Sequence, residues 1–406
     1  MNFRSTRLIP AVAAIAVLWL ARVAASQASP QHGAPQQKPK LAEEVFKNIQ
    51  VLKGTSVDDF LGTMGIMSAA VGFDCSECHT NAGTDKVDWA ADDNPKKLIA
   101  RRMVTMMTTI NRENFNGRQM VTCWSCHHGR DRPATTPAME TVYGPGSTEM
   151  DDVLTQMPGQ PSAVEILDQY IRALGGADRL AGLTSYVGTG TSVGFGGFGG
   201  GAEVHVFAKA PDQHTTLIEF KTETGRGYSV RSYNGRAGWI KTPLAVLTEY
   251  ELTGSEMDGA RLDAQLAFPG QIKQVLTNLK VSLPANISDL PGPSSQTSAD
   301  PKAGIGQDRV VNVVQGTSDK GELVTLYFDK ESGLLLRMLR YGKTPIGRVP
   351  TQIDFADYRD VGGIKFPHRL IFAWLDGRDV IQLNQIETNI SIDEAKFGEP
   401  TSVKGP

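Results

Sequence analysis

The chain has 406 residues, of which 40% are hydrophobic and 21% charged. This is enough apolar material for packed cores, which excludes a wholly disordered chain, and the length fits two or three domains. The formal net charge of −3 disfavours a nucleic-acid binder that relies on overall positive charge. We therefore expect a folded, multi-domain protein with no nucleic-acid partner.

Residues 1–28 have the features of an export signal. Two arginines precede an apolar stretch from Leu8 to Leu20, and small residues follow it, with cleavage expected after Ala25 or Ala28. The stretch is short for a membrane span, although an uncleaved N-terminal anchor is the alternative. The sequence therefore predicts a periplasmic protein, either free or membrane-associated.

Two C-x-x-C-H motifs contain all four cysteines of the chain. In covalent haem attachment, two cysteine sulfurs bond to the porphyrin and the following histidine binds the iron. The sequence therefore predicts two covalent haems c and leaves no cysteine for disulfides. The predicted attachment and ligand residues are Cys75, Cys78 and His79 for the first haem, and Cys123, Cys126 and His127 for the second.

Other uses of paired cysteines fit less well. A zinc site made of four thiolates needs no histidine after each pair. A thioredoxin-like redox motif needs a βαβ pattern, which is missing around both motifs. The adjacent His128 is expected to be a surface residue rather than a ligand.

A helix bearing methionine precedes each motif. Ser56 has the spacing of an N-cap, and the following apolar stripe ends just before Cys75. A second helix is expected to start at Asn94, with Pro95 in its first turn. The apolar stripe of the first helix is Phe60, Met64, Met67 and Val71; the second helix presents Leu98 or Ile99, Met103, Met106, Met107 and Ile110. Core packing is the ordinary role of any one such methionine, but each haem also needs a distal ligand or an open site.

Residues 43–130 resemble the tetrahaem cytochrome c subunit of photosynthetic reaction centres. In that family the helix before each motif supplies a methionine ligand. Carried over by position, the resemblance implies Met64 as ligand of the first haem and Met103 of the second, with Met67, Met106 and Met107 as alternatives. The matching stretches are residues 48–52, 59–64, 75–79, 100–106, 110–111, 121–127 and 129–130.

The chain departs from that family in three ways. Only two of the family's four attachment motifs are present. The loop from Asn111 to Thr122 contains no histidine, so the family's cross-ligand to another haem is missing. The remaining two-thirds of the chain has a different pattern. The resemblance thus implies a di-haem electron-transfer module more strongly than a role in photosynthesis.

The predicted fold class is a small, mainly α di-haem cytochrome c domain followed by a large antiparallel β (α+β), open-barrel-like domain. The expected segments are a flexible lead-in (29–40), the di-haem domain (41–135), a proline-rich linker (136–161) and the sheet domain (162–406). Residues 284–307 are expected to be a long loop. The predicted strands are 203–208, 216–221, 228–232, 238–241, 309–314, 323–328, 334–339, 353–358, 368–374 and 380–385, with helical material at 258–279.

The sheet domain opens with a helix whose capping box is Ser162 and Glu165 and which stops at Gly175 and Gly176. This helix-first, many-stranded pattern is similar to the open β-barrel of periplasmic lipoprotein-sorting carriers. The similarity implies a concave sheet that holds an apolar ligand or docks a partner, and it names no residues.

Two other features of the sheet domain are interpreted as structural. The stretch from Gly194 to Gly199 fits G-x-G-x-x-G, but a strand rather than a helix is expected after it, which favours a hairpin loop over a phosphate site. His205, His214 and His368 have no metal-ligand spacing and are expected to be structural.

The leading hypothesis is a periplasmic di-haem c-type cytochrome that exchanges electrons with a redox partner protein and catalyses no reaction. His/Met ligation would raise its reduction potential. The first alternative is a haem enzyme or gas sensor with an open distal site. The second is an apolar-ligand carrier whose haems sense redox state.

Overall fold

The computed structural model describes residues 38–137, 154–195, 201–222, 225–243, 246–288, 308–375 and 377–400. The predicted export signal, most of the lead-in and the centre of the predicted linker lie outside these ranges. From Lys40 onward the described residues form one compact unit. Within it we distinguish the N-terminal segment (residues 40–137) and the sheet segment (residues 154–400).

Within the described ranges, no helix combines the length and the apolar character needed to cross a bilayer.

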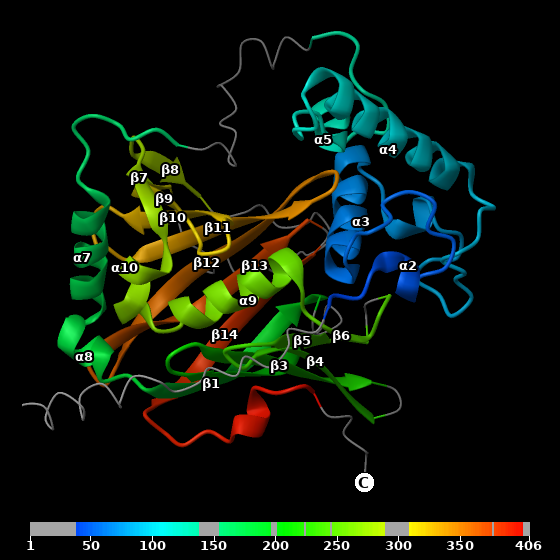
Figure 1. Cartoon of the computed structure of the whole chain (residues 1–406). Helices are drawn as coiled ribbons and strands as arrows, with labels where there is room; N and C mark the ends of the chain where they lie inside the picture. Colours follow the sequence, from blue (N-terminus) through cyan, green and yellow to red (C-terminus); the bar gives the residue numbers. More distant parts are fainter. Residues whose placement is uncertain are drawn as a thin grey trace, which may run out of the picture. The chain divides into compact units, whose positions relative to one another are not determined.

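Two helices dominate the N-terminal segment (Figure 1). The Ser56 side chain accepts a hydrogen bond from the Asp59 backbone N–H and caps α3, and Asn94 caps α4 through the N–H of Lys96. Both helices start where the sequence predicted. The helices of this segment are α2 (Ala42–Val45), α3 (Val57–Val71), η2 (Cys75–Glu77), α4 (Pro95–Asn114) and α5 (Cys123–His127).

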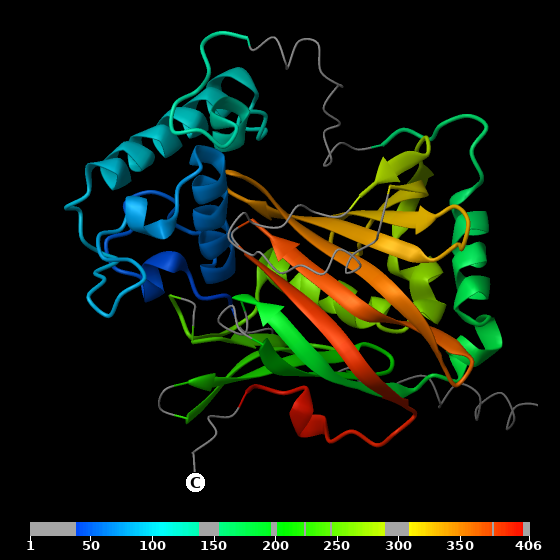
Figure 2. The same cartoon turned by 180° about the vertical axis from the view of Figure 1, so that it is seen from behind.

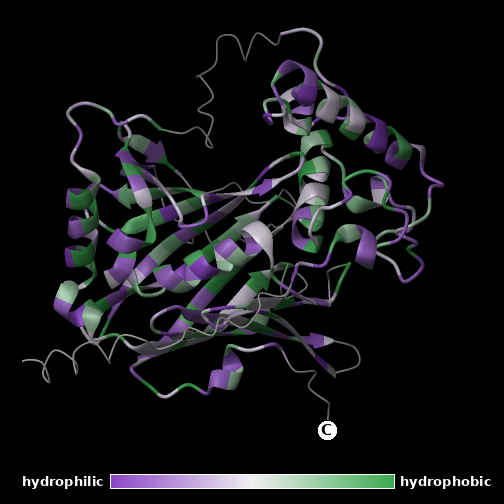
Figure 3. Cartoon of the chain, viewed as in Figure 1, coloured by the Kyte–Doolittle hydropathy of each residue, from purple (hydrophilic) through white to green (hydrophobic). Residues whose placement is uncertain are grey.

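The helices of the sheet segment pack against the sheet. In α7 the predicted capping box of Ser162 and Glu165 is present, and Gly175 ends the helix. Figure 3 shows hydrophobic and hydrophilic residues alternating along α7, as expected for a helix with one buried face. The helices are α7 (Ala163–Leu174), α8 (Ala177–Ala181), α9 (Gly254–Leu266), η4 (Pro269–Gln271), α10 (Ile272–Val275) and η5 (Glu394–Lys396).

The strands of the described residues form one antiparallel sheet of 14 strands. They are β1 (Ser185–Gly194), β2 (Gly201–Lys209), β3 (Gln213–Thr222), β4 (Gly225–Tyr233), β5 (Gly238–Lys241), β6 (Glu249–Glu251), β7 (Thr277–Val281), β8 (Ala285–Ile287), β9 (Arg309–Thr317), β10 (Leu323–Asp329), β11 (Leu335–Thr344), β12 (Gly347–Val361), β13 (Ile364–Trp374) and β14 (Gly377–Thr388).

The sheet is open rather than closed into a barrel. Its order is β6-β5-β4-β3-β2-β1-β14-β13-β12-β11-β10-β9-β7, with β8 also paired to β9, so β6 and β7 are its two ends. The first strand pairs with the last, because β1 lies between β2 and β14. The main core lies between the sheet and α7, α8, α9 and α10, and α9 runs along one face of the sheet (Figures 1 and 2). The predicted fold class, a mainly α segment followed by a large open antiparallel sheet, is confirmed.

Four strands were not predicted. β1 is rich in glycine and threonine and has no apolar alternation, yet it is a central strand. A Cβ atom at Gly190 would lie 1.9 Å from the carbonyl oxygen of Gln382, where the β1–β14 register shifts. Close backbone approach therefore requires glycine in this strand. The short β6 was also missed, β7 replaces the end of the helical stretch expected at 258–279, and β8 lies inside the expected loop 284–307.

The turn between β11 and β12 packs into the N-terminal segment. Ile346 at this turn is fully buried in a small core with Ile66, Val104 and Met107. The side chain of Gln119 donates a hydrogen bond of 3.0 Å to the carbonyl oxygen of Thr344. A residue of the sheet segment thus completes the core of the N-terminal segment.

Candidate functional site

One cavity of about 1620 Å³ contains every residue that the sequence singled out for haem binding. This volume exceeds the roughly 300–1,000 Å³ of a pocket for one small ligand. The predicted residues on its wall are Met64, Cys75, Cys78, His79, Met103, Cys123, Cys126 and His127.

The first motif forms a tight turn, which brings its two thiols and its histidine to the same cavity. The carboxylate of Asp74 accepts a hydrogen bond of 2.8 Å from the Ser76 N–H and caps η2. The N–H of His79 donates to the carbonyl oxygen of Cys75 at 2.9 Å. The start of α4 is tied to this turn, because the Asn94 side chain donates to the carbonyl oxygen of Glu77 at 3.1 Å.

His79 is surrounded by groups that keep its imidazole neutral. Burial, together with the positive charges of Lys97 and Arg101, lowers its pKa. Its ring packs edge-on against Trp89 with 5.1 Å between the ring centroids. Its Nδ1 atom is buried and makes no hydrogen bond within the described part of the chain. A neutral imidazole is the form that binds iron.

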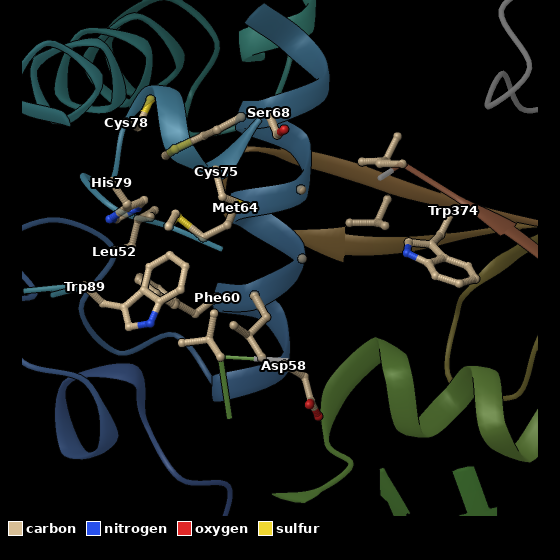
Figure 4. A pocket seen from close by; sticks show the side chains of 18 of the residues that line it. Leu52, Asp58, Phe60, Met64, Ser68, Cys75, Cys78, His79, Trp89 and Trp374 are labelled. Carbon is tan, nitrogen blue, oxygen red and sulfur yellow. The ribbon is translucent and has the colours of Figure 1, made fainter. Parts of the chain in front are cut away.

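Met64 faces the first motif. Figure 4 shows the side chain of Met64 directed toward His79, with Phe60 and Trp89 beside them and the two cysteines of the motif above them in the view. Phe60, Met64, Met67 and Val71 all line the cavity. The opposite face of α3, which includes Thr63, Ile66 and Ala70, is buried. The predicted apolar stripe of α3 is therefore the face that borders the cavity.

The second motif is the helix α5. Thr122 and Ser125 form a reciprocal capping box at its start, and His128 ends it with φ of 49°. The Nδ1 atom of His127 lies 3.0 Å from the carbonyl oxygen of Arg130. Because a carbonyl can only accept, Nδ1 carries the proton and the lone pair of Nε2 is available to a metal. His128 is exposed and stacks on Trp124, as expected for a surface residue.

The three methionines of α4 all line the cavity, but they differ in exposure. Met107 is 5% exposed and packs in the small core with Ile66 and Val104, as a core methionine does. Met103 and Met106 are 37% and 47% exposed and line the cavity. Their greater exposure leaves these two side chains free to reach a group in the cavity.

Asn111 is a functional position that the sequence analysis missed. Its buried side chain donates to the carbonyl oxygen of Val121 at 2.7 Å and accepts from the N–H groups of Met120 and Val121 at 3.0 and 2.9 Å. These hydrogen bonds fix the end of α4 to residues 120–121, which lead into the second motif. An asparagine in helical register with the apolar Val104 and Met107 was the signal available in the sequence.

The two motif regions are in direct contact. The N–H of Gly129, just after the second motif, donates to the carbonyl oxygen of Ala70 at 2.8 Å. Gly72 ends α3 with φ of 70°, and a Cβ atom there would lie 2.5 Å from the carbonyl oxygen of Gly129. Only glycine fits this approach. The end of the first helix therefore packs on the exit of the second motif.

The donor set fits covalently attached haem better than zinc. The four cysteines, all within the described ranges, form no disulfide. Burial raises the pKa of the Cys78 and Cys123 thiols, which disfavours the thiolates that zinc requires. No three His, Cys, Asp or Glu side chains of the described residues converge as a metal-binding group. This includes His205, His214 and His368 of the sheet segment.

The sheet forms the other wall of the cavity. Ile218, Phe372 and Trp374 give this wall apolar surface. Arg231 and Glu256, which also line it, form an ion pair of 2.8 Å. The G-x-G-x-x-G stretch is flanked by two strands rather than by a strand and a helix: β1 ends at Gly194 and β2 begins at Gly201, while residues 196–200 lie outside the described ranges.

Paired thiols followed by histidine, with methionine-bearing helices beside them, are the features of c-type cytochromes. Residues 14–163 match the family described as photosynthetic reaction centre cytochrome C subunit. The photosynthetic reaction center cytochrome c subunit of Roseobacter denitrificans is 30% identical over 151 residues, which are 34% of this chain and 40% of the relative. The subunit of Thermochromatium tepidum is 34% identical over 96 residues, 23% of this chain and 22% of the relative.

This part of the chain is similar to reaction-centre cytochrome c subunits, as the motifs predicted, and that family is one of electron-transfer proteins rather than enzymes. The chain spans 40% or less of the length of these two relatives. Solved structures similar to the chain include a LolA superfamily protein from Nitrosomonas europaea, at 15% identity, 59% coverage of this chain, 99% of that chain and a TM-score of 0.36. A DUF1329 family protein from Desulfovibrio piger is also 15% identical, with a TM-score of 0.36. The match covers 59% of this chain and 98% of that protein.

Proposed function

We propose that the protein is an exported di-haem c-type cytochrome that exchanges electrons with a redox partner protein. The observation that carries the proposal is that both C-x-x-C-H motifs and a methionine of the helix before each motif line one cavity. The size of the cavity accommodates more than one small ligand. The similarity to reaction-centre cytochrome subunits supports electron transfer as the role.

Each side chain has a distinct role in this proposal. Cys75 and Cys78 anchor the first haem, and Cys123 and Cys126 anchor the second, through thioether bonds. His79 and His127 would each hold the iron of one haem through an imidazole nitrogen, and Met64 and Met103 would supply the sulfur ligands. Bound haem supplies a one-electron iron couple, whose potential is higher with His/Met than with bis-His ligation.

Localisation and partner belong to the same proposal. The apolar N-terminal stretch directs the chain to the periplasm, where c-type haem is attached. The names of the relatives associate them with photosynthetic reaction centres. For this chain we propose the coarser partner class, a redox protein that is soluble or membrane-bound.

Haem stoichiometry tests the proposal. The full-length protein, produced with a haem-attachment system, is expected to retain haem in a denaturing gel and to give two haems per chain in a pyridine haemochrome assay. The double variants Cys75→Ala/Cys78→Ala and Cys123→Ala/Cys126→Ala should each retain one haem. His128→Ala, next to the second motif, is the matched control and should retain two. Zinc in place of haem, or no covalent haem, would disprove the proposal.

A second candidate function is the binding of an apolar ligand by the sheet segment. The observation that favours it is the apolar sheet wall of the cavity, which includes Ile218, Phe372 and Trp374. Native mass spectrometry of the purified protein should then detect a co-purified lipid or other apolar molecule, and Phe372→Asp should lower its occupancy. An empty sheet segment that binds no fluorescent fatty acid would eliminate this candidate.

A further inference from the structure

Charge is distributed unequally between the two motif regions. Residues 40–95, which include the first motif, contain four basic and ten acidic residues and a formal charge of −6. Residues 96–132, which include α4 and the second motif, contain eight basic and two acidic residues and a formal charge of +6. The near neutrality of the N-terminal segment as a whole conceals this separation.

The positive charge nearest the first motif is already neutralised. Lys96 is paired with Glu77, beside the first motif. Lys97 and Arg101 are both paired with Asp92, at 3.4 and 2.7 Å. These three cations of α4 therefore link it to the acidic residues of the first motif region, where acidic residues outnumber basic ones.

The arginines around the second motif are available. Arg118, Arg130 and Arg132 are exposed and have no ion pair among the described residues. Arg112, in the last turn of α4, is exposed and pairs only with its neighbour Glu113, at 3.0 Å. An exposed pair of this kind leaves most of the charge in solvent.

Exposed apolar side chains lie among these arginines. Met120 is 57% exposed and Trp124 is 51% exposed, and neither lines the cavity. Asn111 binds the backbone of Met120, which places it beside the end of α4. The Trp124 ring lies within 3.9 Å of the Cβ position of Gly129, next to Arg130. We call the set of Arg112, Arg118, Met120, Trp124, Arg130 and Arg132 the basic surface.

We propose that the basic surface is the docking site of a redox partner protein with an acidic face, and that electrons pass between that partner and the second haem. The inference rests on the proposed function, because it needs a haem attached at Cys123 and Cys126. The first motif region, with its opposite charge, would repel the same partner. On this inference the second haem exchanges electrons with the partner protein, and the first haem exchanges them with the second.

The composition of the basic surface favours a protein as the occupant. The basic surface presents tryptophan, methionine and arginine, the residue types that protein–protein interfaces enrich. Complementary charge raises association rates by about 10- to 1,000-fold at low ionic strength. A fast, salt-sensitive encounter suits an electron carrier, which must also release its partner quickly.

The test uses one probe in two charge states. Azurin, a small blue-copper protein, is used in its native form and with its lysines succinylated, which replaces positive by negative charges. Stopped-flow loss of the blue absorption reports electron transfer from the reduced full-length protein, and calorimetry reports binding. The variant is Arg118→Glu/Arg132→Glu. Its control is Lys53→Glu/Lys86→Glu, which reverses two exposed charges of the first motif region away from the cavity and gives the same net charge.

The inference predicts that succinylated azurin reacts faster than native azurin with the wild-type protein, and that added salt removes the difference. Arg118→Glu/Arg132→Glu should slow the reaction with succinylated azurin about tenfold or more at low ionic strength, and the control should stay within about twofold of wild type. Equal slowing in both variants would overturn the inference, since net charge alone would then act.

Two further outcomes would also overturn it. The first is a rate that is unchanged in Arg118→Glu/Arg132→Glu while sedimentation with phosphatidylglycerol vesicles is lost, which would assign the surface to a membrane. The second is salt-independent binding of succinylated azurin. The haemochrome assay separates these results from failure of the proposed function: a chain without haem transfers no electrons, yet its binding of succinylated azurin still tests the docking site.

Discussion

Asp58, in the first turn of α3, accepts hydrogen bonds from both the backbone N–H and the hydroxyl of Thr253, the N-cap residue of α9. The hydroxyl distance is 2.8 Å. No side chain within α9 caps its own N-terminus. A carboxyl from the N-terminal segment therefore performs this role for a helix of the sheet segment, and it joins the helix of Met64 to the sheet.

This carboxyl is expected to make stability depend on pH. Asp58 is 3% exposed, and burial raises its pKa from 3.8 to about 7. The folded state therefore holds the proton more tightly than the unfolded state. The contribution of Asp58 is greatest below about pH 4 and is lost as pH rises to about 7, by about 2–4 kcal/mol.

Asp58→Asn should remove this pH dependence. As the pH rises from 5 to 8, the melting temperature of the variant should increase relative to that of the wild type. Asparagine keeps the acceptor oxygen but cannot ionise. Thermal unfolding at both pH values measures the effect. Asp85→Asn, at an exposed position, is the control, and its melting temperature should follow that of the wild type at both pH values. If the difference in melting temperature between the wild type and Asp58→Asn does not change with pH, the prediction is contradicted.

The two haems should have different reduction potentials. The Nδ1–H of His127 donates to a backbone carbonyl, which makes the imidazole a stronger donor and stabilises ferric iron. Among the described residues His79 has no such bond, and burial, followed by the charges of Lys97 and Arg101, lowers its pKa. The weaker imidazole donor at the first site favours ferrous iron there.

We therefore expect the first haem to have the higher potential, by tens of millivolts or about a tenfold shift in equilibrium. Redox titration of the two single-haem cysteine variants measures each potential separately. Equal potentials, or a higher potential at the second site, would refute this order. With the expected order, electrons received at the second haem pass on to the first.

Loss of a methionine ligand should remove a spectral band. The ferric spectra of Met64→Ala and Met103→Ala should each lose part of the sulfur-to-iron charge-transfer band. Met120→Ala is the control, because Met120 is exposed and does not line the cavity. It should keep the band. An intact band in both ligand variants would disprove the assignment and direct attention to Met67, Met106 and Met107.

Gly72 should tolerate no side chain. Gly72→Ala combines a positive φ of 70° with a clash against Gly129, so we expect a loss of more than about 2 kcal/mol. Gly54→Ala is the matched control, because Gly54 has φ of 78° but nothing within 4 Å of its Cβ position. It should lose only about 1–2 kcal/mol. Similar melting temperatures for the two variants would show that the contact with Gly129 is unimportant.

The candidate site could be proposed from the sequence because its chemistry is local. The spacing of Cys75, Cys78 and His79 within one turn indicates haem attachment without any tertiary information. Helix starts at Ser56 and Asn94 were predictable for the same reason, since capping is a local interaction. The assignment of Met103 over Met106 remains a prediction, because adjacent cavity-facing positions of one helix differ only in tertiary distance.

The structural features that the sequence did not predict depend on contacts between distant residues. β1 is a strand because Gly190 lets the backbone of Gln382 approach, and no local pattern encodes that partner. The role of Asp58 depends on Thr253, almost half the chain away. The predicted division into two domains by a linker at 136–161 also stays a prediction, since residues 138–153 lie outside the described ranges.

Ile346 has a consequence for the order of events during synthesis. The ribosome completes both motifs long before it adds Ile346, which is fully buried in the core that contains Ile66 and Met107. At that time the N-terminal segment still lacks a part of its own interior. On the proposed export the N-terminal segment would also enter the periplasm first, so an attachment enzyme would meet Cys75 and Cys123 while the core around Ile66 still lacks Ile346. Arrival of the β11–β12 turn would then close this core.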